Sequence, residues 1–404
     1  MPWRETCPME QKRQFVLEWR SHAVSRAALC RLFGISRQTG YKWVRRFERA
    51  LRWEDLEAHS RRPHHHPQTT RRMIVQRIVE ERRRLPLWGP IPLRKRLQTK
   101  WPKIAWPAAS TIGAILKREG LVVRLVRTRG LPPRTHPFVT CREPNDVWCI
   151  DFKGHFALQN GQRCYPLTVM DAATRYLLAC VGFRSPDSAN VRRVVEDLFQ
   201  TYGLPKAMRS DNGEPFACIT APAGLTQLSA WWAKLGIQLE RIDPGKPQQN
   251  SRHERMHLTL KQATCSPPKP SLIRQQLAFD RFRRLYNEER PHQALNLATP
   301  ASLYRPSPRL LPHHVPVPTY PFGDTYLVNA AGAIRWRART FFISNALAGE
   351  CIGIYPLNHR FEEVSFANVL LGLIDTQYPH YGLIRPKTKR NEKPTSRVSA
   401  MSPV

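Results

Sequence analysis

The sequence predicts a multidomain protein with an α-helical N-terminal region, an α/β core on a mixed five-stranded sheet, and a small C-terminal domain resembling a β-barrel. The 404 residues suffice for two or three domains of roughly 100 to 200 residues each. Helical periodicity dominates up to about residue 120, and β-rich segments begin after Asn145. Hydrophobic residues make up 41% of the chain, as in globular proteins with packed cores.

The charge of the chain indicates a polyanionic partner. Lys and Arg number 64 against 31 Asp and Glu, a net charge of +33. Residues 1–140 hold 31 of the basic residues and only 10 of the acidic ones, so we expect the N-terminal third to be the main DNA-holding part. The alternative is a solvated basic surface without a partner, which an imbalance of this size disfavours.

Membrane and secretory classes are disfavoured. No apolar run approaches the roughly 18 residues of a spanning helix, and the N-terminus lacks the apolar core of a signal peptide. The nine cysteines include no Cys-x-x-Cys pair, which predicts reduced thiols in the cytosol rather than disulfides or a structural zinc site. The triplet at 64–66, His-His-His between two prolines, is interpreted as linker rather than as a metal site.

The N-terminal domain, residues 1–58, contains a helix-turn-helix pattern in "SRAALCRLFGISRQTGYKWVRRFE". Leu29, Leu32 and Phe33 give the first helix an apolar face, Gly34 lies in the turn, and Ser36 can cap the second helix. The second helix leaves five polar side chains free for a DNA groove and its phosphates: Arg37, Gln38, Lys42, Arg45 and Arg46. A basic helical hairpin of no special role is the alternative.

A second helical domain, similar to a helix-turn-helix, is expected at residues 70–123. A linker at 59–69 precedes it and a basic linker at 124–144 follows it. In "STIGAILKREG" Ser110 can cap a helix and Gly120 can end it.

Residues 145–300 have the element order of a ribonuclease H-like core. In chain order, the segments are strands at 147–154, 165–171 and 175–183, a helix at 188–202, a strand ending at Asp211, a helix at 225–235, a strand at 237–242 and a helix beginning near Gln248. A proline-rich linker at 301–324, the small β-domain at 325–385 and a disordered basic tail at 386–404 complete the chain.

Three acidic residues lie on elements of that order that would be close together in such a fold. Asp151 lies in the first strand, Asp211 ends the fourth, and Glu254 follows the turn in "PGKPQQNSRHERMH" on the last core helix. In such a sheet the first and fourth strands are neighbours, so the two aspartates would lie side by side with the glutamate helix across their ends. Converging carboxylates repel unless cations neutralise them. Two Mg²⁺ ions, with Mn²⁺ as a substitute, would do so and would support an in-line phosphoryl displacement.

Four motifs in order resemble the catalytic core of bacterial insertion-sequence transposases, the Asp-Asp-Glu superfamily shared with retroviral integrases. The motifs are "WCIDF" at 148–152, "SDNG" at 210–213, "PQQN" at 247–250 followed by Glu254-Arg255, and "YN" at 286–287 followed by "RPHQ" at 290–293. With the N-terminal helix-turn-helix and the C-terminal β-domain, the likeness covers nearly the whole chain.

The resemblance implies that Asp151, Asp211 and Glu254 are the catalytic, metal-binding residues. It also implies a transposase that binds the terminal inverted repeats of its element, cuts a strand with water and joins the 3′-hydroxyl to target DNA. Double-stranded DNA, both element ends and target, would be the partner of a homo-oligomer in the bacterial cytoplasm at the nucleoid. Lys261 matches a basic position of the family, and at i, i+3 and i+7 we expect Glu254, His257 and Lys261 to share a helix face beside a DNA phosphate.

Two departures from the family pattern concern the glutamate. Asp211 and Glu254 are separated by 42 residues where many members have about 35, and the surplus is expected at 217–232. Ser251 replaces a common glycine.

Two other carboxylates have structural interpretations. Asp171 is expected in a turn or paired with Arg175 rather than bound to a metal, and Glu214 is expected to have a structural role in its loop rather than a role beside the metal ligands. The rival functions are a catalytically inactive, transposase-derived DNA-binding regulator and a ribonuclease H-like nuclease that cuts without joining.

Overall fold

The computed structural model describes residues 7–57, 69–122, 141–218, 220–242 and 247–384. The predicted tail at 386–404, nearly all of the linker at 59–69 and most of the basic linker at 124–144 lie outside these residues. The chain divides into two compact units, residues 1–70 and residues 71–404, and each is considered by itself.

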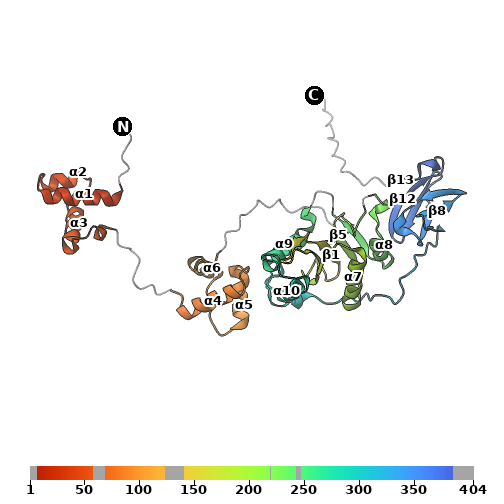
Figure 1. The fold of residues 1–404 in the computed structure, drawn as a ribbon, viewed down its shortest axis with the longest axis horizontal. Coiled ribbons are helices and arrows are strands. Elements are labelled where there is room, and N and C mark those ends of the chain that lie inside the picture. The colour runs from red at the N-terminus through yellow and green to blue at the C-terminus, as the bar shows by residue number, and fades with distance from the viewer. Residues whose placement is uncertain (1–6, 58–68, 123–140, 219, 243–246, 385–404) are drawn as a thin grey trace, which may run out of the picture. The chain divides into compact units, whose positions relative to one another are not determined.

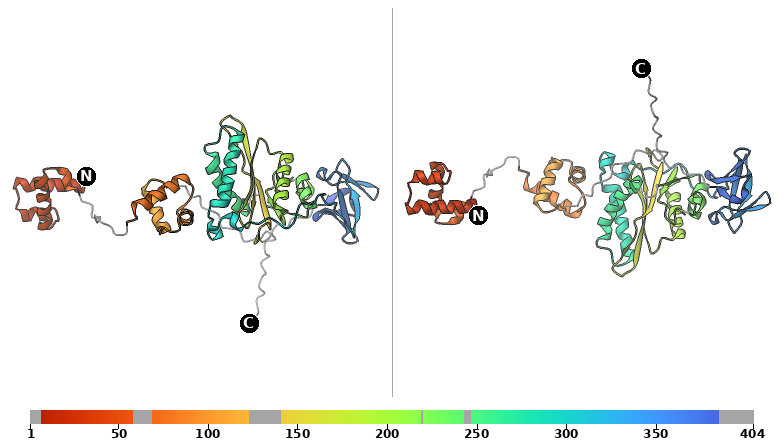
Figure 2. Two further views of the ribbon diagram at one scale, coloured as in Figure 1. Left: turned by 90° about the horizontal axis from the view of Figure 1, so that it is seen from below. Right: turned by 90° about the horizontal axis from the view of Figure 1, so that it is seen from above.

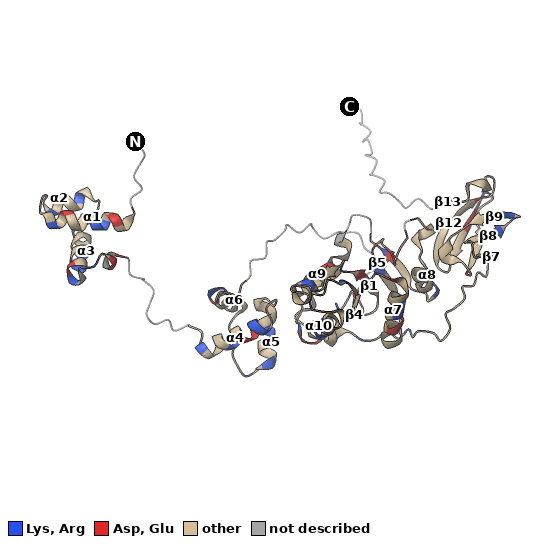
Figure 3. Ribbon diagram, viewed as in Figure 1, with Lys and Arg blue, Asp and Glu red and all other residues tan. Residues whose placement is uncertain are grey.

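The first unit is a small helical domain (Figure 1). Its elements are α1 (Pro8–Ser21), α2 (Arg26–Leu32), α3 (Arg37–Ala50) and a 3₁₀ turn η1 (Trp53–Leu56). The hydroxyl oxygens of Ser25 and Ser36 accept from the backbone N–H groups at the starts of α2 and α3, as the sequence predicts for Ser36. The core of the unit includes Phe15, Leu29 and Phe47, and its Lys and Arg residues lie along the helices (Figure 3).

Close packing between α3 and its neighbours depends on Gly40. A Cβ at this position would lie 2.9 Å from Cys30 Sγ and 2.9 Å from Phe15 Cζ. Val44 and Phe47 of α3 are buried in the core of this unit, whereas Tyr41 is 38% exposed.

The second unit opens with three helices, α4 (Arg72–Arg84), α5 (Pro90–Lys100) and α6 (Ala109–Arg118). Their buried contacts include Ile78, Leu93 and Ile112. Ser110 is not the N-cap of α6, because the helix already begins at Ala109 and Ala108 provides no side-chain cap.

A mixed sheet forms the centre of the core. Its strands are β1 (Val147–Phe152), β2 (Phe156–Ala157), β3 (Arg163–Asp171), β4 (Leu177–Phe183), β5 (Ala207–Ser210) and β6 (Gln238–Arg241). The order is β4-β3-β1-β5-β6, with the two-residue β2 paired to β3. The β1–β3 and β3–β4 pairs are antiparallel, and the β1–β5 and β5–β6 pairs are parallel. The predicted five-stranded mixed sheet is confirmed, with β2 as an addition.

Helices cover both faces of this sheet (Figure 2). On one face, α7 (Ser188–Tyr202) and α8 (Gln227–Lys234) pack on Trp148, Ile150 and Leu167. On the other face lie α9 (Ser251–Leu260), which follows a 3₁₀ turn η3 (Pro247–Asn250), and α10 (Leu272–Arg284). Both of these helices continue as π-helical turns, η4 (Lys261–Cys265) and η5 (Leu285–Glu289).

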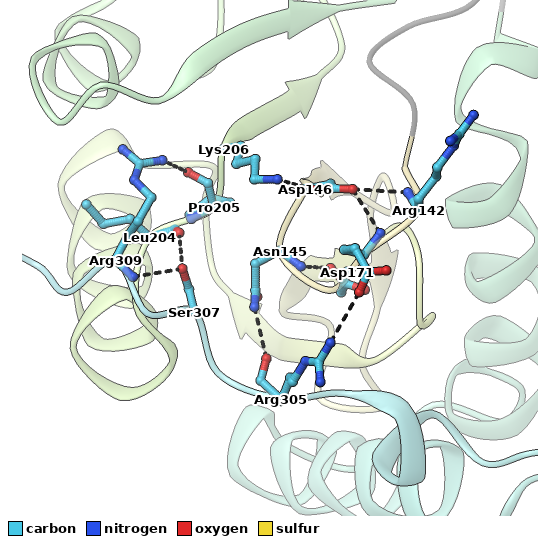
Figure 4. A network of polar contacts seen from close by, with 11 residues as sticks. Arg142, Asn145, Asp146, Asp171, Leu204, Pro205, Lys206, Arg305, Ser307 and Arg309 are labelled. Carbon is cyan, nitrogen blue, oxygen red and sulfur yellow. Dashed lines mark hydrogen bonds and ion pairs between the residues drawn. The ribbon is translucent and has the colours of Figure 1, made fainter.

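The segment after the core follows the sheet closely before the β-domain begins. After η6 (Gln293–Leu295) and α11 (Pro300–Leu303), Asn145 Nδ2 donates to the Arg305 carbonyl at 2.9 Å, and Arg309 Nη1 donates to the Pro205 carbonyl at 2.7 Å. Ser307 Oγ donates to the Leu204 carbonyl at 2.7 Å (Figure 4). Part of the predicted linker at 301–324 is therefore bound to the core by specific hydrogen bonds.

The C-terminal domain is an antiparallel sheet with a separate hairpin. The sheet has the order β13-β12-β11-β10-β7, and β8 pairs with β9. The strands are β7 (Asp324–Leu327), β8 (Ala333–Trp336), β9 (Arg339–Phe342), β10 (Cys351–Pro356), β11 (Phe361–Phe366), β12 (Val369–Asp375) and β13 (Leu383–Ile384), with 3₁₀ turns η7 (Asn345–Leu347) and η8 (Pro379–Tyr381).

The segment between Asp211 and Glu254 in which the surplus residues are expected lies against this domain. It includes the 3₁₀ turn η2 (Pro222–Gly224), and Leu225, Ala230 and Ala233 join Ile352 and Phe366 in one buried cluster. Lys234 Nζ and Glu350 form an ion pair at 2.8 Å beside it. The longer spacing therefore provides a packing surface and leaves the order of the sheet unchanged.

Candidate active site

Asp151 and Asp211 lie on neighbouring strands of the sheet. The β1–β5 register pairs Val147 with Ala207 and Cys149 with Arg209. Continued by two residues, this register places Asp211, just past the end of β5, at the level of Asp151. Alternation along β1 puts Asp151 on the face opposite to Trp148 and Ile150, which is the face that α9 covers.

Asp151 has an unusual electrostatic environment. Burial, together with the neighbouring charges of Asp211 and Glu254, raises the pKa of its carboxyl to about 7 against the opposing effects of the Phe152 N–H and of Lys153. Its side chain is 22% exposed. A hard divalent cation prefers oxygen ligands and neutralises their negative charge. The carboxylates of Asp151, Asp211 and Glu254 are therefore ligands of the type that Mg²⁺ prefers.

The loop after β5 holds Asp211 through short local contacts. The Gly213 N–H donates to Asp211 Oδ1 at 3.2 Å, and Asn212 Nδ2 donates to the Ile242 carbonyl at 2.6 Å, which fixes the loop to the end of β6. A Cβ on Gly213 would lie 3.2 Å from Asp211 Oδ2, so a larger residue would press on the carboxylate. Glu214 is exposed at the rim of this loop.

Glu254 is exposed in the first turn of α9. It is close enough to Asp151 to act on its pKa. Within the described parts of the chain, however, no three His, Cys, Asp or Glu side chains are gathered tightly enough to hold a metal ion. Residues 243–246, which lead toward α9, are outside those parts. The structure thus places the two aspartates together and leaves the glutamate near them without closing a three-ligand site.

A buried network connects α9 to the strand of Asp151. Thr168 Oγ1 on β3 lies 2.6 Å from His253 Nε2, 2.7 Å from His257 Nε2 and 3.2 Å from the Asp151 carbonyl oxygen. His257 Nδ1 lies 3.8 Å from Asp151 Oδ2. Burial lowers the pKa of His253 to about 3 and also lowers that of His257, so both imidazoles are neutral near pH 7.

The number of hydrogen bonds that the Thr168 hydroxyl can donate and accept limits the possible tautomers of His253 and His257. A hydroxyl has one proton to donate and two lone pairs to accept with, and it has three partners here. If Thr168 donates to the Asp151 carbonyl, both histidines carry their proton on Nε2 and donate to the hydroxyl. If it donates instead to His257 Nε2, the proton of His257 is on Nδ1 and faces the Asp151 carboxylate. Either arrangement joins the helix of Glu254 to the strand of Asp151.

The expected common face of Glu254, His257 and Lys261 is wrong. His257 is buried, whereas Glu254 and Lys261 are exposed. The α-helix ends at Leu260, and Lys261 begins a π-helical turn with a different angular spacing. Sequence reasoning also missed the role of His253 and Thr168. The signal was the i, i+4 spacing of His253 and His257, which puts both histidines on one side of the helix.

Asp171 is a structural residue, as expected. Its side chain is fully buried, and it accepts from Asn145 N at 2.8 Å, Thr174 N at 2.7 Å and Thr174 Oγ1 at 2.6 Å. These bonds fix the turn between β3 and β4.

The predicted DNA-contact residues of α3 are not equivalent. Arg37, Gln38, Lys42 and Arg45 are exposed. Arg46 is half-buried: its guanidinium lies 5.3 Å from the centre of the Trp43 ring, and its Nε and Nη2 are buried without a hydrogen-bond partner. The first four side chains are therefore available to a ligand, whereas Arg46 packs within its own domain.

Comparison with known families finds two kinds of domain in this chain. Residues 142–247 and 235–300 match families described as integrase core domains, and residues 11–64 match a helix-turn-helix domain. Within the described residues, no helix is long and apolar enough to cross a membrane.

Several relatives come from insertion elements. An uncharacterized 31.7 kDa protein of insertion element IS407 from Burkholderia multivorans is 32% identical over 46% of this chain and 65% of its own length. An uncharacterized 39.2 kDa protein of insertion element IS476 from Xanthomonas euvesicatoria is 32% identical over 39% of this chain and 44% of its own length. The chain thus matches less than two thirds of the length of either relative.

Solved structures of retroviral integrases are similar at lower identity. The catalytic core of HTLV-2 integrase in complex with magnesium is 12% identical, with a TM-score of 0.32 over 40% of this chain and 98% of that one. A chain of the simian T-cell lymphotropic virus intasome is 14% identical, with a TM-score of 0.35 over 72% of this chain and 97% of that one. The domain matches and the insertion-element relatives by themselves confirm the predicted resemblance: this chain carries an N-terminal helix-turn-helix domain and an integrase core domain.

Proposed function

We propose that this protein is a transposase that binds the terminal inverted repeats of an insertion sequence, cuts a DNA strand at each end and joins it to target DNA. The observation that carries the proposal is the pair Asp151 and Asp211 on neighbouring strands of an integrase core, with the electrostatic influence of Glu254 on Asp151. A DNA substrate would place the protein at the bacterial nucleoid.

Asp151, Asp211 and Glu254 would hold Mg²⁺, and the ion would supply Lewis-acid activation of the attacking and leaving oxygens. The carboxyl of Asp151 must be ionised to serve as a ligand. Thr168 and His257 keep the strand of Asp151 in place, and the Gly213 N–H orients the carboxylate of Asp211. Glu254, exposed on the first turn of α9, would complete the set by a movement of that turn toward the aspartates.

Recognition of the DNA ends belongs to α3 in this proposal. Exposed Arg37, Gln38, Lys42 and Arg45 would reach base edges and phosphates in a major groove. Lys261, exposed at the start of η4, would contact a phosphate near the cut. A complex of at least two copies is needed to hold two element ends at once.

The test uses duplexes carrying the short inverted repeats that flank the gene. With Mg²⁺ or Mn²⁺, the full chain should nick the repeat and then produce a joined product with a second duplex, and EDTA should abolish both. Nicking without any joined product would favour the nuclease alternative. Specific binding of the repeat without nicking in either metal would favour the inactive regulator.

A further inference from the structure

Basic side chains from three elements converge around the turn between β3 and β4, away from the three carboxylates. Arg252 on α9 donates through Nη1 to the Ala172 carbonyl at 2.8 Å. From η5, the Asn287 side chain accepts from Leu177 N at 2.8 Å and donates to the Leu177 carbonyl at 3.0 Å. Arg175 lies between these two anchor points, and Arg290 follows η5. We refer to Arg175, Arg252 and Arg290 as the arginine cluster.

The positive charge of this cluster has no counter-charge in the parts of the chain that the structure describes. No ion pair there involves any of its three arginines. The nearby carboxylates are engaged elsewhere: Asp171 accepts two hydrogen bonds from Thr174 within its turn and one from the Asn145 N–H, and Glu289 pairs with Arg96.

Two nitrogen atoms in this region are buried without any hydrogen-bond partner, Arg175 Nε and His292 Nε2. His292 packs on Tyr286, with ring centres 4.7 Å apart, and Arg290 lies 5.8 Å from the centre of the same ring. Burial lowers the pKa of Arg175 and of Arg290, and Arg252 and Arg255 respectively lower them further. Burial and Arg290 lower the pKa of His292 to about 4. An unsatisfied buried donor of a charged group is costly unless a ligand completes it.

The backbone at Arg175 adds to this cost. Its φ is 65°, in the left-handed region that glycine and asparagine tolerate and that disfavours a long side chain by roughly 1–2 kcal/mol. The turn itself is held by Asp171 and Thr174 and does not require an arginine. Arginine is therefore unfavourable in the backbone conformation of this turn, whereas its guanidinium group is well suited to bind an anion.

We infer that the arginine cluster binds a phosphate group of the DNA backbone at the turn between β3 and β4. Guanidinium groups match phosphate oxygens with paired N–H donors, and the exposed Arg252 would present such donors to a phosphate at the surface of the cluster. Arg252 lies two residues before Glu254 on the same helix, so a strand bound by the cluster would contact the helix that carries Glu254. The inference depends on the proposed function only in taking DNA as the ligand.

The test is the salt dependence of binding of the full chain to a non-specific fluorescent duplex, measured by anisotropy in EDTA so that no strand is cut. The slope of log K against log salt is negative, and each lost phosphate contact reduces its magnitude by about 0.9. A lowered slope means a slope of smaller magnitude. We expect a decrease of about 0.9 for Arg175→Asn and for Arg252→Gln. Arg274→Gln, which removes an exposed arginine of α10 outside the cluster, should leave the slope unchanged.

Thermal unfolding separates this role from a structural one. Because asparagine suits the φ of Arg175, Arg175→Asn should keep or raise the melting temperature while it lowers the slope. A lowered melting temperature with an unchanged slope would show that Arg175 is only a turn residue. Arg252 is exposed, so Arg252→Gln should stay folded. Its salt slope can then be measured even if Arg175→Asn unfolds.

A second titration with inorganic phosphate distinguishes DNA from a small anion. If phosphate raises the melting temperature of the wild type more than that of Arg175→Asn while the DNA slopes are equal, the cluster is a small-anion site and the inference is wrong. Equal slopes with no difference in phosphate also overturn it. Because no step requires cleavage, a protein that fails to cut DNA can still pass this test, and the two proposals can fail separately.

Discussion

At the residue scale, ionisation of the Asp151 carboxyl is unfavourable in the folded protein. Its pKa of about 7 is far above the usual value near 4, because burial and two neighbouring carboxylates oppose its ionisation. A bound divalent cation would remove this penalty, since it favours the ionised form. The penalty therefore affects the metal-free protein most.

This predicts a pH dependence of stability with a definite sign. An acid with a raised pKa is still protonated in the folded state when it is already ionised in the unfolded chain, so the metal-free protein loses stability as the pH rises from about 4 to about 7. Asp151→Asn removes this contribution. Urea unfolding in EDTA should show that the variant gains stability relative to wild type across this window, by on the order of a few kcal/mol. A difference that is constant with pH would contradict the account.

Thr168 is the residue on which the buried histidine network depends. Thr168→Val keeps the shape of the side chain but leaves His253 and His257 without their shared partner, so we expect a loss of about 1–3 kcal/mol in the free energy of unfolding. Thr168→Ser keeps the hydroxyl and serves as the matched control. Equal losses for the two variants in urea unfolding would show that packing of the methyl group matters and the hydroxyl does not.

At the scale of elements, the sequence predicts the sheet better than it predicts the faces of the helices. The place of β5 beside β1 follows from the order of strands and helices, so Asp151 and Asp211 could be paired in advance. The buried face of α9 could not, because it is decided by Thr168, a residue 85 positions before His253, and by the change to a π-helical turn at Lys261. Local periodicity contains neither fact.

Helix α3, which we propose as the recognition helix, contains a matched pair of neighbouring arginines. Arg45 is exposed, so Arg45→Ala should weaken DNA binding and lower the salt slope by about 0.9 without changing stability. Arg46 packs on Trp43, so Arg46→Ala should instead destabilise the domain by roughly 0.5–2 kcal/mol. Anisotropy at several salt concentrations and urea unfolding measure the two effects. If Arg46→Ala changes the slope and Arg45→Ala does not, the assignment of the DNA-facing side is reversed.

At the scale of the whole molecule, our proposal assigns recognition of the DNA ends to the first unit and the candidate chemistry to the core. The first unit has its own hydrophobic core, and residues 1–140 contain nearly half of the Lys and Arg residues with a third of the Asp and Glu residues. We therefore expect a fragment of residues 1–140 to bind inverted-repeat DNA alone, with an affinity that falls steeply with salt. Specific binding of the repeat by residues 141–404 and none by residues 1–140 would show that recognition lies in the core.

The central claim is that Asp151, Asp211 and Glu254 act as one metal-binding set, although in the structure the glutamate lies near the aspartates without closing a three-ligand site. The direct test is strand transfer in Mg²⁺ by Glu254→Gln, which keeps the size of the side chain and removes its charge. Glu214→Gln, at the rim beside Asp211, is the matched control. The account predicts that Glu254→Gln loses all strand cleavage and transfer, as Asp151→Asn and Asp211→Asn do, while it binds repeat DNA like wild type, and that Glu214→Gln stays active. Near wild-type transfer by Glu254→Gln, or an inactive Glu214→Gln beside it, would contradict the account.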